Sequence, residues 1–350
     1  MIAAEPHDDV PRLVFADWLQ ENGREARAEF IRVQIDLSRM GEDDPDRAEL
    51  ARREERLFRK NRKRWGKELP YRFRSDRYER GFVVGRMPGS LDGFLRAADE
   101  TEALIPSWAL DWWWPTTPAE GWQDLRAFDR VVRLSLRWSH RDEPALDPFT
   151  ACEHWRNLAS LHVRDARIQP EQLAVLLAAG HTPRLEELDL NNSLLNETTV
   201  AALAESDTWG RLRHLGLHGL MARPPLVEEL TAAGSPGELL SLDLSNTHIG
   251  DEGVERLLTW SHLPKLRSLS LASAGLTDVG ATALSLSTDL ENLTHLDLSD
   301  NMIGMAGAKA LAESGSLGGL RRLLAGRNRF SGFHESRRQL TARFGDHVEL

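Results

Sequence analysis

The sequence places a serine, a histidine and an aspartate at intervals of 27 residues, at Ser135, His162 and Asp189. These are the residue types of a catalytic triad, in which the histidine takes the serine proton and the aspartate orients the histidine. The residues around Ser135 contain no sharp nucleophile turn and no pair of convergent backbone donors for an oxyanion. We therefore predict a row of hydrogen-bonded polar side chains rather than a catalytic site, and we expect no enzymatic activity.

His214 and His218 stand four residues apart, a spacing that lets two histidines share a zinc ion on a helix. The surrounding pattern indicates a strand instead, where four residues span about 13 Å and one ion cannot bridge the two rings. Cys152 is the only cysteine, which rules out an internal disulfide, and we expect it to pack in the interior. The sequence thus predicts no metal site and no cofactor.

A strongly basic stretch lies at residues 52–86, with fourteen Lys or Arg against five acidic residues. Aromatic residues, among them Trp65 and Tyr78, are interspersed with these charges. Basic and aromatic side chains together can bind phosphates and stack on bases, which makes the stretch a candidate nucleic-acid interface. The alternative is a solvated helix whose aromatic residues pack inward, and it is favoured because no named nucleic-acid motif is present. The candidate contact residues are Arg59, Lys60, Arg62, Lys63, Arg64 and Lys67.

The segments that position the polar residues repeat with the same 27-residue period. Each repeat begins with an apolar anchor, followed after three residues by a leucine and after five by another apolar residue, an alternation typical of a strand. Later in each repeat comes an apolar pair spaced i, i+3, such as Val254 with Leu257, which indicates one face of a helix. Strands and helices must therefore alternate, with the strands parallel and side by side. The anchors are Val131, Leu158, Leu185, Leu212, Leu239, Leu266, Leu293 and Leu320.

The best-defined repeat, residues 293–311, resembles a leucine-rich repeat of the ribonuclease-inhibitor-like type. The resemblance implies an α/β solenoid with parallel strands on its concave side and helices on its convex side. In that family an asparagine bonds the backbone where the chain leaves the strand, and here only Asn301 and Asn328 keep it. The other repeats carry different residues at this position.

The region ahead of the repeats resembles a bacterial repeat-companion domain, a short helical segment that has no established activity. The resemblance rests on residues 10–23, where Gly23 is the expected end of a helix, on residues 27–34, 80–84 and 94–99, and on residues 344–350. We expect a small helical companion region at 1–79, an N-terminal cap at 80–130, about eight repeats at 131–335 and a C-terminal cap at 336–350.

Both ends of the array need caps, since an open solenoid would expose its last apolar layer to water. Residues 105–110 imitate the strand pattern ahead of the first anchor, and Leu340 and Phe344 share one face of a helix. We expect a strand at the first position and a closing helix at the second.

In-register parallel strands place equivalent positions about 4.8 Å apart, so polar residues form columns on the concave face. A mixed-charge surface of this kind is typical of a solenoid that binds a protein partner, and the alternative is simple solvation of an exposed sheet. The net charge of −10 argues against general binding of nucleic acids or anionic membranes. We predict a cytoplasmic interaction scaffold, because the sequence shows no signal peptide and no long apolar run. The expected contact residues are Arg133, Arg137, His162, Arg164, Glu187, Asp189, His214 and His218.

Overall fold

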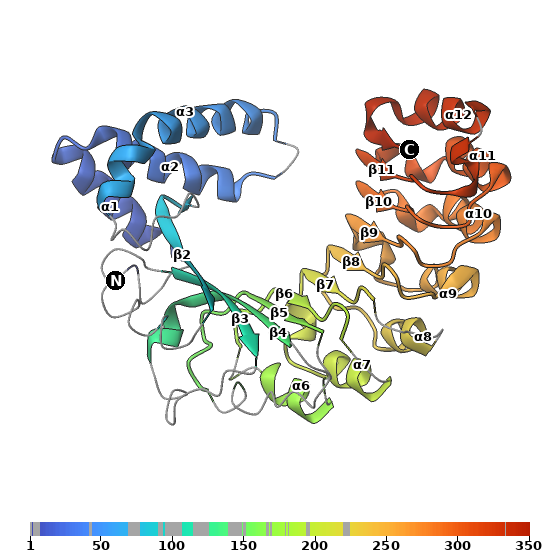
Figure 1. Ribbon diagram of the computed structural model, residues 1–350, viewed down its shortest axis with the longest axis horizontal. Helices are drawn as coiled ribbons and strands as arrows, with labels where there is room; N and C mark the ends of the chain where they lie inside the picture. Colours follow the sequence, from blue (N-terminus) through green and yellow to red (C-terminus); the bar gives the residue numbers. More distant parts are fainter. Residues whose placement is uncertain are drawn as a thin grey trace. The chain divides into compact units, whose positions relative to one another are not determined.

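In the computed structural model the chain forms two compact units, Met1–Ser135 with Glu153–Leu158, and Leu136–Cys152 with Ala159–Leu350 (Figure 1). Each unit has strands and helices of its own. The domain boundaries expected at residues 79, 130 and 335 stay predictions. The residues that the structure describes are 2, 8–41, 44–68, 78–89, 94, 107–114, 126–138, 149, 152–165, 168, 170–178, 180, 182–193, 197–219, 225–332 and 334–350.

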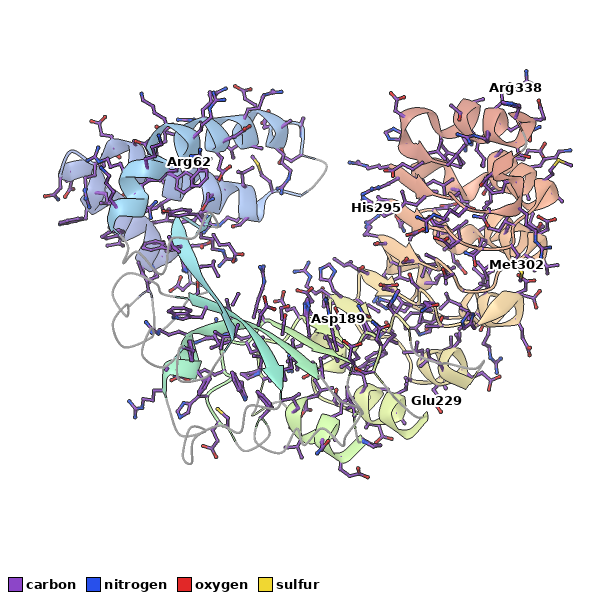
Figure 2. The ribbon with its side chains drawn as sticks, viewed as in Figure 1. Arg62, Asp189, Glu229, His295, Met302 and Arg338 are labelled. Atoms are coloured by element: carbon purple, nitrogen blue, oxygen red, sulfur yellow. The ribbon has the colours of Figure 1, made fainter. Side chains whose placement is uncertain are left out.

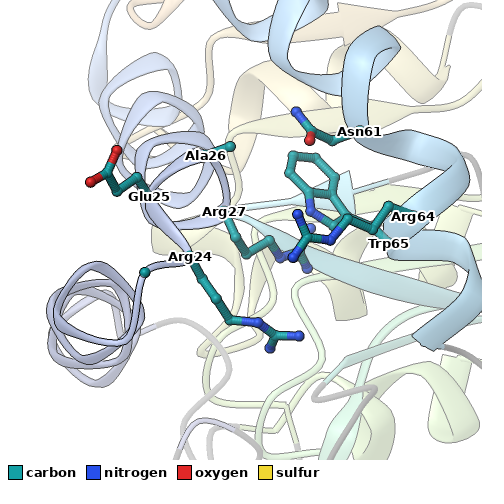
Figure 3. Close-up of a pocket in the computed structure, with 8 residues that line it drawn as sticks. Arg24, Glu25, Ala26, Arg27, Asn61, Arg64 and Trp65 are labelled. Atoms are coloured by element: carbon teal, nitrogen blue, oxygen red, sulfur yellow. The ribbon is translucent and has the colours of Figure 1, made fainter.

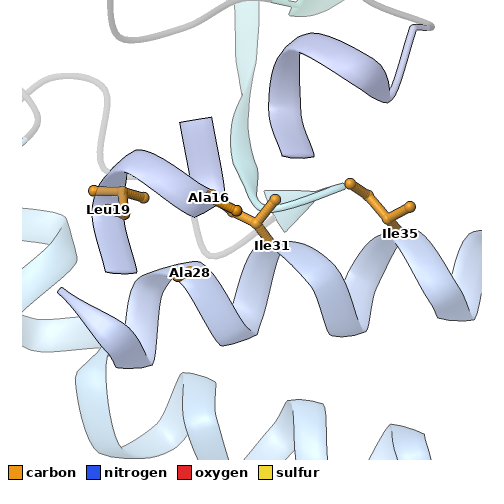
Figure 4. Packing of buried hydrophobic residues seen from close by; sticks show 5 residues of the cluster. All are labelled: Ala16, Leu19, Ala28, Ile31 and Ile35. Atoms are coloured by element: carbon orange, nitrogen blue, oxygen red, sulfur yellow. The ribbon is translucent and has the colours of Figure 1, made fainter. Parts of the chain in front are cut away.

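The first unit begins with three helices, α1 (Val10–Glu21), α2 (Glu25–Arg39) and α3 (Arg47–Trp65), and the short 3₁₀ turn η1 (Gly66–Glu68). The expected helix end at Gly23 is confirmed, since this residue has a φ of +71° between α1 and α2. Facing side chains of α1 and α2 form a small apolar core (Figure 4). Its buried members are Ala16, Leu19, Ala28, Ile31 and Ile35.

The strands of the first unit follow the helices in chain order. They are β1 (Tyr78–Glu79), β2 (Phe82–Gly89), β3 (Ser107–Trp114) and the beginning of β4 (Val131–Trp138), whose residues from Leu136 on belong to the second unit. The 3₁₀ turn η4 (Arg126–Arg130) precedes β4. β1 and β2 form an antiparallel pair, whereas β2 and β3 are parallel. β3 bears out the strand expected from residues 105–110, and it buries Trp108 and Leu110.

The second unit alternates strands and helices along the repeats. Its strands β5 to β12 are Ser160–Arg164, Glu187–Asp189, His214–Gly216, Ser241–Asp243, Ser268–Ser270, His295–Asp297, Arg322–Leu324 and Val348–Glu349. Its helices α6 to α12 are Pro170–Leu176, Glu197–Ala204, Pro225–Ala232, Gly250–Leu257, Asp278–Leu286, Met305–Glu313 and His334–Phe344. 3₁₀ turns also occur in this unit; they are η5 (Trp209–Arg211), η6 (Leu263–Lys265), η7 (Thr288–Leu290), η8 (Ser316–Gly319), η9 (Arg329–Gly332) and η10 (Gly345–His347).

The pairing of these strands confirms the predicted parallel register. Each strand from β5 to β11 pairs with the next so that equivalent positions of successive repeats are neighbours, as in Leu161 with Leu188 and Leu188 with Leu215. The strand leucines at this position are at most 2 % exposed, and both members of each apolar helix pair are buried as well. The core of each repeat therefore lies between its strand and its helix, as the fold predicted from the sequence requires.

The last repeat is covered in the way expected of a cap. Leu340 and Phe344 on α12 are buried, which bears out the closing helix. After α12 the chain adds β12, a strand that was not expected and that pairs in parallel with β11.

The turn that leaves each strand also repeats in the second unit. The residue seven positions after the anchor has a left-handed φ, between +51° and +71°, in each of its seven repeats. Asn and Asp adopt this conformation more readily than most other residues, and Gly adopts it without strain. These positions are Asp165, Asn192, Gly219, Asn246, Ser273, Asp300 and Arg327.

The next position in the turn holds the expected asparagine in two repeats and smaller polar groups in two others. The Asn301 and Asn328 side chains are buried and bond the backbone of their own and of the preceding repeat. Ser193 donates to Val163 O at 3.0 Å, and Thr247 donates to Leu244 O. A hydroxyl thus replaces part of the missing amide in these two turns.

Candidate functional site

The strands of the second unit present a polar surface on the side away from the helices. Side chains alternate between the two faces of a strand, so the residues on either side of each buried leucine point outward together. We call the surface that these residues form on β5 to β11 the strand face. Asp189 and His295 lie on this side of the repeats, whereas Glu229 and Met302 lie on the helix side (Figure 2).

Five side chains of β5 and β6 form a connected polar cluster on the strand face. His162 Nε2 lies 3.0 Å from Ser160 Oγ and 3.1 Å from Glu187 Oε1. Arg164 donates to Asp189 Oδ2 at 2.7 Å, and the same Arg164 nitrogen lies 3.3 Å from His162 Nδ1. Register explains the contacts, because Ser160 pairs with Glu187 and His162 pairs with Asp189.

Both carboxylates of the polar cluster have hydrogen-bond partners within it. The hydrogen bond from His162 lowers the pKa of Glu187 to about 2, with smaller contributions from the Ser160 hydroxyl and from the His162 and His214 rings, while desolvation opposes them. Asp189 is 8 % exposed and is held by Arg164 and by the backbone N–H of Asn191, which donates to Asp189 Oδ1 at 2.9 Å. Glu187 is therefore ionised at neutral pH, and both carboxylates are fixed in position.

The serine hydroxyl beside His162 belongs to Ser160, two residues earlier on β5, whereas the predicted row began at Ser135, which is part of the first unit. His162 places Nε2 toward Ser160 Oγ and Nδ1 3.5 Å from Asp189 Oδ2, which is the order of groups in a triad. Ser160, however, is only 3 % exposed. Its hydroxyl also shares His162 Nε2 with the carboxylate of Glu187, which contacts the same nitrogen. A nucleophile must reach its substrate, so these contacts favour the hydrogen-bonded row that the sequence predicted.

The structure gathers four of the eight expected contact residues, His162, Arg164, Glu187 and Asp189, into the polar cluster. Ser160 was missed because equivalent positions were compared across strands, whereas residues two apart on one strand also share a face.

The other four expected contact residues have different surroundings. His214 is exposed on β7, in register with Glu187. His218 lies two residues beyond the end of β7, so its expected place on the strand was wrong; its N–H donates to Asn191 Oδ1 at 2.8 Å. Arg133 belongs to the first unit and forms an ion pair with Glu79 at 3.0 Å, and the Arg137 side chain lies outside the described residues.

The six basic candidates of the first unit are all exposed, five of them on the last two turns of α3 and Lys67 on η1. The aromatic residues near them behave differently. Trp65 is buried, and its ring packs 4.8 Å from Phe30 and 6.2 Å from Tyr78, measured between ring centroids. The inward-packing alternative is thus confirmed for Trp65 and Tyr78, while Tyr71 and Phe73 lie outside the described residues.

The described part of the chain contains no group of three or more His, Cys, Asp or Glu side chains placed to hold a metal ion. Cys152 is fully buried, as expected of a packing residue. None of the described helices combines the length and apolar character that a bilayer crossing requires.

Three stretches of the second unit, residues 239–258, 262–285 and 290–312, match the sequence model of the leucine-rich repeat. The chain therefore contains leucine-rich repeats, and the matched stretches hold β8 to β10 and α9 to α11. Repeats of this class generally mediate protein–protein interactions and are generally not enzymes.

No curated protein matches the chain. Among solved structures, the chain is similar to a chain in the crystal structure of the mouse RP105/MD-1 complex, with 16% sequence identity and a TM-score of 0.40. That alignment covers 72% of this chain and 44% of the other, so the chain spans less than half the length of this structural neighbour.

Proposed function

We propose that this protein is a non-enzymatic scaffold that binds a protein partner on the strand face, the concave side of its leucine-rich repeats. The observation that carries the proposal is the polar cluster, in which histidine, arginine and two carboxylates are held on adjacent strands. Side chains already fixed by mutual contacts lose little conformational entropy when a partner binds. The cluster is therefore suited to recognise a partner through directed hydrogen bonds.

The surroundings of the cluster support contact with another protein. His214 is exposed directly beside Glu187, and Gly216 follows Asp189 in the same column. Beyond them the strand face carries small side chains at Ser241, Ser268 and Ser270. Small residues leave room for a partner's side chains to approach the sheet, while the polar cluster supplies specificity at one end.

A matched pair of variants tests the proposal. Glu187→Gln with His214→Ala alters exposed groups of the strand face, and Lys309→Ala with Glu313→Gln alters an exposed ion pair on α11 at the helix side. We expect a partner captured by the tagged wild-type chain to be lost with the first pair and kept with the second, with circular dichroism showing that both variants are folded. Retention by the strand-face variant, or equal loss from both, would contradict the proposal.

A second candidate function is nucleic-acid binding through the exposed basic residues of α3 and η1. The observation that favours it is the exposure of all six candidates on one short segment. Binding of a labelled single-stranded oligonucleotide should then weaken steeply with salt, and replacing Lys60, Lys63 and Lys67 by Gln should reduce the salt slope. A lack of binding at low ionic strength excludes this function.

We further infer that the helical region is of the bacterial repeat-companion type, that the repeats are ribonuclease-inhibitor-like and that the protein is cytoplasmic. The strand-plus-helix repeat and the three helices ahead of it support the first two inferences. The capture experiment described above would also identify the partner.

A further inference from the structure

One outward position of the strands, four residues after each anchor, alternates between aspartate and a small residue. The parallel pairing joins each residue at this position to the next, so together they form a row across the strand face. We call this set the aspartate row. From β6 to β10 it consists of Asp189, Gly216, Asp243, Ser270 and Asp297.

The three aspartates of the row are held by the backbone in the same way. In each, Oδ1 accepts a hydrogen bond at 2.9 Å from the backbone N–H two residues later in the chain. At Asp189 the other oxygen, Oδ2, accepts from the Arg164 guanidinium at 2.7 Å. Asp189 therefore shows what completes a carboxylate at this position: a backbone N–H at one oxygen and a guanidinium at the other.

Asp243 and Asp297 have the first of these partners but not the second. Neither carboxylate forms an ion pair with any residue that the structure describes, and each has only its backbone hydrogen bond. Arg164 comes from the sixth position after the anchor of the repeat preceding Asp189. The equivalent residues ahead of the other two aspartates are His218 and Ala272, so neither repeat supplies a guanidinium of its own.

The strand face around these two carboxylates carries no Lys or Arg from β7 to β10. On β11, Arg322 is paired with Glu349 at 2.9 Å. Other arginines gather in the first unit, where Arg24, Arg27 and Arg64 line a cavity of about 210 Å³ between the start of α2 and the end of α3 (Figure 3). The surface from β7 to β10 is thus complementary to a cationic partner. Besides the aspartate row, its outward residues are His214, Ser241, Ser268 and His295.

The spacing of the two carboxylates limits what fits them. Asp243 and Asp297 are both in register with Ser270, so two strand spacings, together about 10 Å, separate them. Ser270 is small, and its hydroxyl lies 2.6 Å from that of Ser245, which leaves both aspartates accessible from the open side of the sheet. On an α-helix, residues i and i+7 share a face and lie about 10.5 Å apart along the axis.

We propose that the strand face from β8 to β10 binds a helical segment of a partner protein that presents two arginines on one face, seven residues apart. Their guanidinium groups complete Asp243 and Asp297 as Arg164 completes Asp189. This inference rests on the proposed scaffold function and names the chemistry of the partner. An anionic partner such as a nucleic acid is disfavoured here, because like charges brought together cost free energy.

Fluorescence anisotropy with the full chain tests the proposal. The probe is a labelled helical peptide with arginines at i and i+7, and the control peptide has the same composition with its arginines at i and i+5, on different faces. We expect saturable binding of the first peptide at low ionic strength, weakened about tenfold in the double variant Asp243→Asn with Asp297→Asn. Asparagine keeps an oxygen for the backbone N–H, so the variant should fold, which circular dichroism checks.

Glu252→Gln with Glu255→Gln is the matched control. It removes the same two charges from exposed positions on α9, and we expect less than about a twofold effect. Absence of saturable binding of the first peptide, equal binding of both peptides, or equal weakening by the two double variants would each overturn the proposal. Self-association of the chain that is lost with the two aspartates would make a second copy the occupant, and would also overturn it.

Failure of this inference can be told apart from failure of the scaffold function. A captured partner that is lost with Glu187→Gln and His214→Ala but kept with Asp243→Asn and Asp297→Asn would overturn only the inference drawn here. A partner kept by all of these strand-face variants would contradict the scaffold function as well.

Discussion

Asn301 connects two consecutive repeats through a side chain that is almost fully buried. Its amide nitrogen donates to Leu271 O at 2.8 Å in the preceding repeat and to Leu298 O at 3.0 Å in its own. Its oxygen accepts from the backbone N–H groups of Gly275 and Leu276 at 2.9 and 3.0 Å. We predict that Asn301→Ala weakens the contact between these two repeats more than the replacement of an exposed asparagine by alanine does.

The size of the effect follows from the groups that lose a partner. The substitution leaves two backbone N–H donors without the acceptor they have in the native protein, and each buried donor without a partner costs about 1–3 kcal/mol. Water that enters the space left by the shorter side chain can bond one of these groups and so offsets part of the lost free energy. We therefore expect a loss of about 3 kcal/mol in the free energy of unfolding. In urea the midpoint should fall by about 1 M.

Hydrogen exchange locates the effect. If the opening is local, the Gly275 and Leu276 amides should lose about a hundredfold in protection. Asn292→Ala is the control, because Asn292 lies nearby and is exposed; its side chain bonds Pro264 O at 2.9 Å. We expect that control to cost less than about 1 kcal/mol. Equal losses from the two variants would refute the reasoning.

Two further predictions concern pH. Burial lowers the pKa of His262 below its usual 6.5, although its bond to the Leu239 carbonyl opposes this; the unfolded chain therefore binds the proton more readily, and stability should fall as pH drops below about 6.5. His262→Gln should lessen that slope in urea midpoints between pH 8 and 5, and an unchanged slope would count against it. Glu187, with a pKa of about 2 against an ordinary 4.5, contributes stability that is present above pH 4.5 and lost as pH falls toward 2. Glu187→Gln should flatten the melting temperature over that range, and a curve parallel to that of the wild type would show that the hydrogen bond from His162 does not stabilise the fold.

The periodic part of the molecule could be predicted from the sequence because burial repeats with the spacing of the residues. Leu188 and Leu215 are equivalent in the sequence, and they are neighbours in the sheet. The same argument placed Glu187 and Asp189 outward on β6, and it placed the apolar helix pairs inward. Where the period was interrupted, as at β12, the expectation was incomplete, since no repeat of the leucine pattern marks that strand.

The sequence by itself determined the class of fold, the register of the strands and which side of the strand each repeat residue is on, because local periodicity and burial set all three. Only the tertiary structure decided that Ser160 is the hydroxyl at His162 and that Arg24, Arg27 and Arg64 line one cavity. The rotamer of a histidine ring and the meeting of two helix ends that are distant in the chain depend on how side chains pack, and residue spacing carries no record of that packing.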